Sequence, residues 1–267
     1  MRAITEVALL RYHVLLAMLP FLARSAGPLG IDVGGANSVV ATTRNGGVDV
    51  IVNEASRRQT PSLVGFDKQQ RLIGQRATTQ LTSNPENCVG EIKALLGLSL
   101  EKARQLEPKP LASLVDAKGA SSSLSDLSHV AVRLRGTEQY FSATQLLAML
   151  LFQLQRYAED ELGSSTSDCT IAVPLHFTAA KRRAVLDAAQ IAGLRGARLI
   201  SDGTAAALDF ALGRQDLPAD QDHNVAFVDI GYNGMQICVV AIRCNSLRLL
   251  SHAFAPGVGG AVSETHP

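Results

Sequence analysis

The sequence predicts an α/β fold, and two observations lead to this prediction. Apolar runs with strand character alternate with stretches whose apolar residues recur at helical spacing, most clearly from Ser142 onward. In addition, one short pattern occurs twice, at residues 30–41 and 227–240: an apolar run, an Asp-x-Gly turn and a second apolar run. The 267 residues are 46% hydrophobic and 18% charged, which is typical of a globular protein with enough chain for one large domain or two smaller ones.

The repeated hairpin predicts a phosphate site. In each copy the first apolar run leads to a carboxylate, Asp32 or Asp229, and a glycine follows two residues later, Gly34 or Gly231. Glycine lets backbone N–H groups approach a phosphate closely, and an aspartate can hold a hydrated divalent metal. Two copies suggest two half-sites that face each other across a nucleotide cleft.

The first half of the chain contains weaker signals. Extended stretches are predicted at residues 48–52 and 63–66, separated by a polar loop that contains a proline. A helix is predicted from Asn84, the N-cap before a proline, to a terminating glycine at Gly97. Residues 107–128 show no convincing period, so we expect a loop or an irregular insertion there.

The second half of the chain has stronger secondary-structure signals, because capping residues and glycines mark the ends of the apolar patterns. The predicted elements are, in order, a leucine-striped helix from Ser142 to Gly163, a strand over 169–173, a helix from Thr178 to Gly193, a strand at 199–200, and a helix over 204–212 that ends at Gly213.

Three acidic residues fall at strand ends, namely Asp32, Asp202 and Asp229. Ligands of open α/β sheets bind beyond the carboxyl ends of the strands, so this placement favours one shared site. The alternative is that Asp202 only caps its helix and that the other two only shape turns.

Charge and cysteine content exclude some classes of function. The net charge of +1 gives no electrostatic reason to expect a nucleic-acid partner. The four cysteines have no metal-ligand spacing, so we expect reduced core thiols and not a disulfide framework. They are Cys88, Cys169, Cys238 and Cys244.

Several motifs, in the expected order, resemble the ATPase domain of the heat shock protein 70 superfamily. They are the runs 30–41, 53–62, 71–74, 172–177, 191–194, 201–207 and 227–231, together with the Arg182-Arg183 helix. The residues of these motifs most resemble those of the large heat shock protein 110 branch, including Gln215-Asp216-Leu217-Pro218 before the second hairpin. The resemblance extends from about Gly30 to Gly260.

This resemblance implies an actin-like ATPase domain in which two ribonuclease H-like lobes enclose an ATP–Mg cleft. Lobe I would be complete over residues 30–218, with an inserted subdomain at about 59–141. Residues 219–267 would be an incomplete, truncated start of lobe II, because family members continue well beyond this point.

Site residues follow from the resemblance by position. Gly34, Gly35 and Asn37 would line the first phosphate loop and Gly231 the second, with Gly259 and Gly260 in a further glycine turn near the phosphates. Asp32 and Asp229 would hold the metal, and Asp202 would orient metal-bound water, so these three would be the catalytic aspartates.

The chain also departs from the family pattern. Gly35 and Ala36 replace two phosphate-loop threonines, and Thr78 replaces a lysine. The Gly-Gly-Gly-Thr of the second hairpin has become residues 231–234, Gly-Tyr-Asn-Gly, and Gly203 replaces a common proline. Since the loss of one preorganised group can cost about 10²–10³ in rate, we expect ATP binding with weak or absent hydrolysis.

Three hypotheses about function remain open. The first is an ATP-binding stress-response chaperone that assists folding as a nucleotide-exchange partner or holdase, with a heat shock protein 70 chaperone and unfolded client proteins as partners. The second is a degenerate interaction module that binds no nucleotide. The third is another actin-fold ATPase such as a sugar kinase, although no separate catalytic aspartate is evident for one.

Residues 1–29 are predicted to be an N-terminal extension or a signal peptide. The apolar run 14–23 is too short to span a membrane, and Ala23-Arg24-Ser25 offers a cleavage site. Because Glu6 and His13 interrupt the lead-in, we expect a cytoplasmic protein with no membrane partner. The lumen of the endoplasmic reticulum is the alternative if residues 1–25 are removed.

Overall fold

The computed structural model describes residues 27–263 except 45, 69, 107–108, 121–129, 213, 215, 218–219 and 245. Several expectations therefore lie wholly or partly outside the described residues. They concern the N-terminal extension, the serine-rich end of the predicted 107–128 loop, the helix end at Gly213, the motif at 215–218 and the last four residues. None of the helices in the described part is both long and apolar enough to cross a lipid bilayer.

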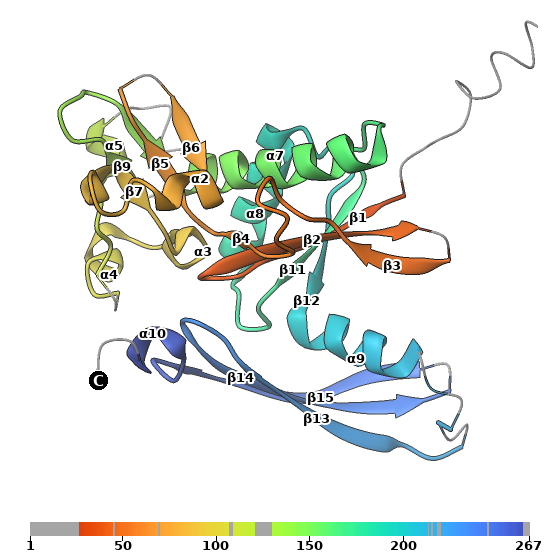
Figure 1. Ribbon diagram of the computed structural model, residues 1–267. Coiled ribbons are helices and arrows are strands. Elements are labelled where there is room, and N and C mark those ends of the chain that lie inside the picture. Colours follow the sequence, from red (N-terminus) through yellow and green to blue (C-terminus); the bar gives the residue numbers. More distant parts are fainter. Residues whose placement is uncertain are drawn as a thin grey trace, which may run out of the picture.

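The described residues form one six-stranded sheet and three three-stranded sheets, arranged as in Figure 1. The six-stranded sheet has the order β12-β11-β1-β2-β3, and β4 pairs with β2. Its strands are β1 (Leu29–Val33), β2 (Asn37–Arg44), β3 (Gly47–Val50), β4 (Thr60–Pro61), β11 (Cys169–Val173) and β12 (Arg198–Ser201). Strands β1, β11 and β12 run parallel, so their carboxyl ends meet at one edge of the sheet. The mixed α/β class and the first predicted hairpin are confirmed.

Two long helices, α7 (Ala143–Leu162) and α8 (Ala179–Ala192), pack together against this sheet (Figure 1). Helix α7 begins at a capping box in which the Ser142 hydroxyl accepts from Gln145 N at 3.1 Å and Gln145 Oε1 accepts from Ser142 N at 2.9 Å. The predicted leucine stripe supplies the centre of the core, with Leu146, Leu147, Leu150, Leu151 and Leu154 almost wholly buried. The predicted caps Thr178 and Gly193 are also confirmed for α8.

The described residues between Val64 and Ser142 form two further sheets beside α7. Their strands are β5 (Val64–Phe66), β6 (Arg71–Ile73), β7 (Cys88–Val89), β8 (Ser113–Asp116), β9 (Val130–Arg133) and β10 (Tyr140–Ser142). Their short helices are α2 (Gln75–Thr78), η2 (Pro85–Asn87), α3 (Ile92–Leu95), α4 (Leu100–Ala103) and α5 (Ala117–Ala120). The loop predicted over 107–128 is therefore wrong in part, because β8 and α5 lie within it and β8 pairs with β9, which begins just after it.

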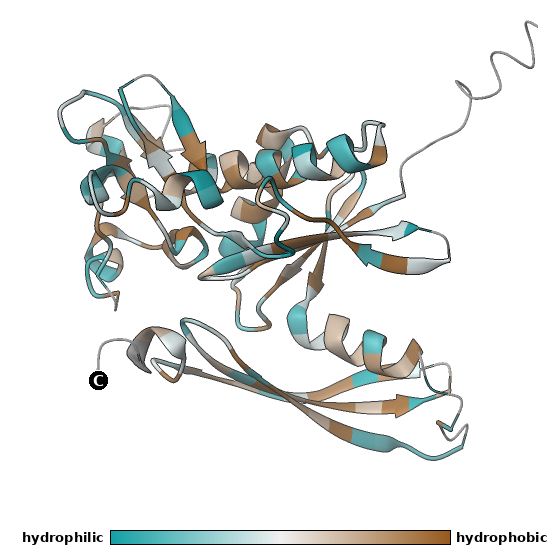
Figure 2. Cartoon of the chain, viewed as in Figure 1, coloured by the Kyte–Doolittle hydropathy of each residue, from teal (hydrophilic) through white to brown (hydrophobic). Residues whose placement is uncertain are grey.

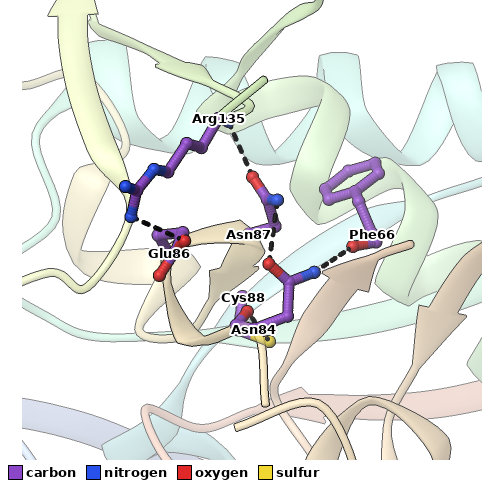
Figure 3. A network of polar contacts seen from close by, with 6 residues as sticks. All are labelled: Phe66, Asn84, Glu86, Asn87, Cys88 and Arg135. Carbon is purple, nitrogen blue, oxygen red and sulfur yellow. Dashed lines mark hydrogen bonds and ion pairs between the residues drawn. The ribbon is translucent and has the colours of Figure 1, made fainter. Parts of the chain in front are cut away.

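The helix predicted from Asn84 is also wrong. A single 3₁₀ turn follows Asn84, and β7 then pairs with β5 before the short α3. The Asn84 side chain does not cap a helix but donates to Phe66 O at 2.8 Å and accepts from Asn87 Nδ2 at 2.9 Å (Figure 3). Arg135 completes this network through Asn87 and an ion pair with Glu86 (Figure 3). Long-range pairing thus overrides the local helix signal.

The second predicted hairpin is confirmed as part of a separate sheet. It consists of β13 (His223–Ile230), β14 (Gly234–Arg243) and β15 (Ser246–Pro256), and it is followed by α10 (Gly260–Ser263). Helix α9 (Asp202–Leu212) lies between this sheet and β12 (Figure 1).

One face of this sheet is packed against α9, and apolar side chains elsewhere on the sheet are exposed to solvent. On the α9 side, Ala207 packs against Cys238, Val240 and Ile242. Elsewhere on the sheet apolar side chains stay exposed: Val228 is 57% and Ile230 is 67% accessible, and Figure 2 shows apolar bands along all three strands.

The cysteines are all free thiols. Cys88, Cys169 and Cys238 are buried as expected, but the prediction of a core position is wrong for Cys244. This residue is exposed because it lies in the turn between β14 and β15.

Replacement of Ser142 by alanine is expected to lower the free energy of unfolding by about 1 kcal/mol, because it leaves the Gln145 N–H at the start of α7 without its acceptor. Urea denaturation followed by circular dichroism measures the loss. Ser99→Ala is the matched control: Ser99 caps the four-residue α4 at 3.4 Å, so its loss should be clearly smaller. Equal losses would contradict this account of α7.

Candidate functional site

A cleft of about 1050 Å³ lies between the carboxyl edge of the six-stranded sheet and the second hairpin. This volume is at the upper end of the range for ligand sites in proteins, and is large enough for a nucleotide. Eight of the nine predicted site residues line it: Asp32, Gly34, Gly35, Asn37, Asp202, Asp229, Gly231 and Gly260. The ninth, Gly259, lies behind the second turn, where an added Cβ would be 2.6 Å from the carbonyl oxygens of Gly231 and Tyr232.

The two hairpins have the same turn geometry. Gly34 N donates to Asn37 O at 3.0 Å, and Gly231 N donates to Gly234 O at 3.0 Å. The first turn needs glycine because a Cβ at Gly34 would lie 2.3 Å from Asn37 O. Neighbouring segments hold both turns: the Ser62 hydroxyl donates to Gly34 O at 2.8 Å, and Gly260 N donates to Gly231 O at 3.0 Å.

Gln236 links two of the predicted aspartates. Its side-chain Nε2 donates to Asp202 Oδ2 at 3.0 Å and to Asp229 Oδ2 at 2.7 Å. Two further oxygens of this group, Asp202 Oδ1 and Gln236 Oε1, are buried and have no hydrogen-bond partner among the described residues. The site therefore presents two acceptors that require a donor or a cation.

Asp32 faces these carboxylates from the end of β1. Its side chain opens into the cleft, yet the surrounding protein displaces enough water to raise the pKa of the carboxyl above its usual value. Lys93 opposes this shift, whereas the negative charges of Asp202 and Asp229 add to it. The three strand-end aspartates thus share one electrostatic environment.

The donor set fits magnesium that arrives with phosphate. In the described part of the chain, no three His, Cys, Asp or Glu side chains come together closely enough to hold a metal ion by themselves. Mg²⁺ typically keeps several waters and uses one or two carboxylates plus substrate phosphates, so a complete protein cage is not required. The unpartnered oxygens of Asp202 and Gln236 are suited to accept from metal-bound water.

Several polar residues that line the cleft were not among the predicted site residues, including Lys93, His176, Lys181 and Gln236. His176 follows the carboxyl end of β11, so the strand-end rule that selected Asp32 could also have found it. Lys93 lies on the short α3, between core residues that masked its role. The two lysines supply positive charge to a cleft that otherwise contains three aspartates.

His176 is a tightly packed member of this group. Its ring stacks on Phe254 with centroids 3.7 Å apart, and Nδ1 is buried without a partner among the described residues. Burial, then the charges of Lys181 and Lys93, lower the pKa of His176. Burial also lowers the pKa of Lys181.

Thr78 lies outside the main cleft. It lines an adjoining cavity of about 460 Å³ that shares Gly35 and Ala36 with the cleft. Its hydroxyl donates to Gln75 O at 2.7 Å within α2. The position that carries a lysine in the family pattern therefore provides no charge to the site.

Gly203 is explained by packing. A Cβ at this position would lie 2.4 Å from Cys238 Sγ and 3.1 Å from a methyl group of Leu175. The first turn of α9 can approach β14 this closely only because residue 203 has no side chain.

Comparison with known proteins decides the family. The family model described as Hsp70 protein matches residues 28–264. The chain belongs to the Hsp70 family. The resemblance carried by the sequence motifs is confirmed, and membership implies an actin-like ATPase fold of a type that binds nucleotide with Mg²⁺.

Curated relatives of this Hsp70-family chain support the assignment. It is 38% identical over 235 residues to heat shock 70 kDa protein 14 of Arabidopsis thaliana, 37% over 240 residues to a heat shock protein homolog of Naumovozyma castellii, and 40% over 236 residues to heat shock protein hsp88 of Neurospora crassa. Each match covers 87% of this chain, and the three matches cover 27%, 34% and 32% of the respective relatives. The chain therefore spans about a third or less of their length.

Gly203→Ala is expected to destabilise the protein by about 1–3 kcal/mol, because the added methyl group overpacks the contact with Cys238. Cys238→Ala in the same chain should recover most of the loss by removing Sγ. Thermal and urea unfolding of the two single variants and the double variant measure this coupling. Gly119→Ala on α5, where an added Cβ would meet nothing within 4 Å, is the control and should be neutral. Additive losses in the double variant would contradict the assigned contact.

Proposed function

We propose that this Hsp70-family chain binds ATP with Mg²⁺ in the cleft between its two glycine turns, and that it hydrolyses ATP slowly or not at all. The observation that carries the proposal is the convergence of Asp32, Asp202, Asp229 and both turns on one cleft of about 1050 Å³. These residues come from segments up to about two hundred positions apart, so their meeting is a property of the fold.

Different residues of the cleft would bind different parts of ATP–Mg. Bound ATP–Mg would supply the phosphoryl group and the charge that polarises it. Asp32 and Asp229 would hold the hydrated metal, and the unpartnered Oδ1 of Asp202 would accept a hydrogen bond from metal-bound water. Lys93 and Lys181 line the same cleft and would offset the negative charge of the phosphates.

Slow hydrolysis follows from what surrounds the phosphate position. Gly35 and Ala36 provide no hydroxyl group, and Thr78 donates its own to the backbone of α2. Preorganised donors aimed at developing charge are a principal source of catalytic rate. The loss of these groups would therefore reduce the rate of ATP hydrolysis more than it reduces the affinity for ATP.

In the cell, we propose a cytoplasmic nucleotide-exchange partner or holdase for a heat shock protein 70 chaperone and unfolded clients. The endoplasmic reticulum is the alternative compartment if residues 1–25 are removed. Family membership favours these roles over a sugar kinase. The second candidate, an interaction module without nucleotide, is favoured by the exposed Val228 and Ile230 on the β13–β15 sheet.

Calorimetric titration of the full chain with ATP–Mg tests the binding proposal. Asp229→Ala should weaken ATP binding at least about tenfold, because it removes a metal-holding carboxylate and one partner of Gln236. Asp209→Ala, an exposed aspartate on α9 outside the cleft, is the matched control and should leave the affinity unchanged. Absence of detectable heat at millimolar ATP–Mg would reject the proposal in favour of the interaction module.

Phosphate release under single-turnover conditions tests the hydrolysis proposal. We expect release to be slower than dissociation of ATP in the wild-type chain. Thr78→Lys should accelerate release by up to about 10², since it restores a charge beside Gly35 and Ala36. Thr79→Lys places the same charge at the exposed residue that follows α2 and should have no effect. Rapid release by the wild-type chain would contradict this part of the proposal.

A further inference from the structure

Asn233 joins the two glycine turns directly. Its Nδ2 donates a hydrogen bond to Glu91 Oε2, on the segment that precedes α3. Its Oδ1 lies against the first turn, where a Cβ added to Gly35 would be only 2.0 Å away. The Asn233 side chain therefore fills the space between the two turns that would enclose the phosphates.

Glu91 is held in an unusual conformation for this contact. With φ of 50°, it is one of two non-glycine residues with positive φ in the described part of the chain. This left-handed conformation is costly for a residue with a side chain, and such strain is found where the surrounding structure has a use for it. Burial raises the pKa of the Glu91 carboxyl, and the hydrogen bond from Asn233 opposes that shift.

The contact also involves two paired departures from the family pattern. Threonine is expected at position 35 and glycine at position 233, whereas this chain has Gly35 and Asn233. A threonine Cβ at 35 would collide with the Asn233 amide as it lies here. The side chain between the turns has in effect moved from the first hairpin to the second, and its new bond to Glu91 ties the turn before β14 to the segment before α3.

We propose that the hydrogen bond between Asn233 and Glu91 is an intramolecular latch that closes the space between the two glycine turns and opens when a nucleotide phosphate chain enters it. The latch rests on the proposed function and adds a regulatory contact to that site. A ligand with phosphates must displace the latch, whereas a nucleoside need not. The latch therefore weakens the binding of ATP and ADP relative to adenosine.

Titration of the full-length variants with ATP–Mg, ADP–Mg and adenosine tests the latch. Asn233→Ala and Glu91→Ala should each tighten binding of ATP by about tenfold, the scale of a hydrogen bond to a charged group, and adenosine by less than about twofold. The double variant should bind ATP no more tightly than either single variant, because both remove the same bond. Asn224→Ala, on the exposed part of β13, is the matched control and should change neither affinity.

The opposite result is equally informative. If Asn233→Ala binds ATP more weakly or with unchanged affinity, the latch is overturned, and weaker binding would mark Asn233 as a ligand of the phosphates. If no variant binds any of the three ligands, the proposed function fails. The latch is then tested by hydrogen exchange in the absence of any ligand. Amide hydrogen exchange at residues 231–234 should be faster in Asn233→Ala than in Asn224→Ala, and equal rates would overturn the latch.

A packing test is independent of nucleotide. Gly35→Thr should lower the melting temperature of the otherwise wild-type chain, because its side chain collides with Asn233. The same substitution in an Asn233→Gly background should be tolerated. Equal losses in both backgrounds would show that Asn233 does not occupy the space between the turns.

Discussion

The close contact between the first turn of α9 and β14 sets the geometry on which the site depends. Strand β12 ends at the carboxyl edge of the parallel strands, and α9 begins there with Asp202. Gly203 then lets the helix approach Cys238 so closely that no side chain fits between them. This approach brings Asp202 within reach of Gln236 and thereby of Asp229 on the second sheet. A wider separation would leave the strand-end carboxylates on two unconnected surfaces.

Much of this arrangement could be predicted because it depends on residues that are close together in the sequence. The Asp-x-Gly turns carry their own glycine requirement, and Ser142 and Gln145 form a box whose two hydrogen bonds span four residues. The errors have a common cause in distant contacts. Asn84 meets all the local conditions for a helix N-cap, but β7 gains pairing with β5 and the Asn84 amide gains Phe66 O instead. Gln236 was missed for the same reason, since its role exists only when α9 lies against β14.

The electrostatics of the cleft give a physical reason for the proposed separation of ATP binding from ATP turnover. Asp32 has a raised pKa, so its ionisation lowers the stability of the fold: the loss begins as pH rises above the unfolded-state pKa and is complete once pH has passed the folded-state pKa. A cation placed among Asp32, Asp202 and Asp229 would stabilise the ionised Asp32 and so offset this loss of stability. The cation would be bound more tightly because it relieves this electrostatic strain. That gain requires only carboxylates, which the chain has. Acceleration of phosphoryl transfer requires donors aimed at the reacting group, which Gly35, Ala36 and Thr78 do not supply.

The departures from the family pattern are not independent losses, because two of them have a partner in space. Gly203 leaves room for the Sγ of Cys238, and Gly35 leaves room for the amide of Asn233. In each case a side chain absent from one segment is matched by an atom from a neighbouring strand or turn. These contacts pack α9 against β14 and the first glycine turn against the second. At the second position the exchange also replaces a hydroxyl that would face phosphate with an amide that is already bonded to Glu91. Under the proposed function, the same substitutions that keep the two turns together would therefore remove a donor from the reaction and place a barrier before the phosphates. A fold of the Hsp70 family would in this way be retained for regulated binding.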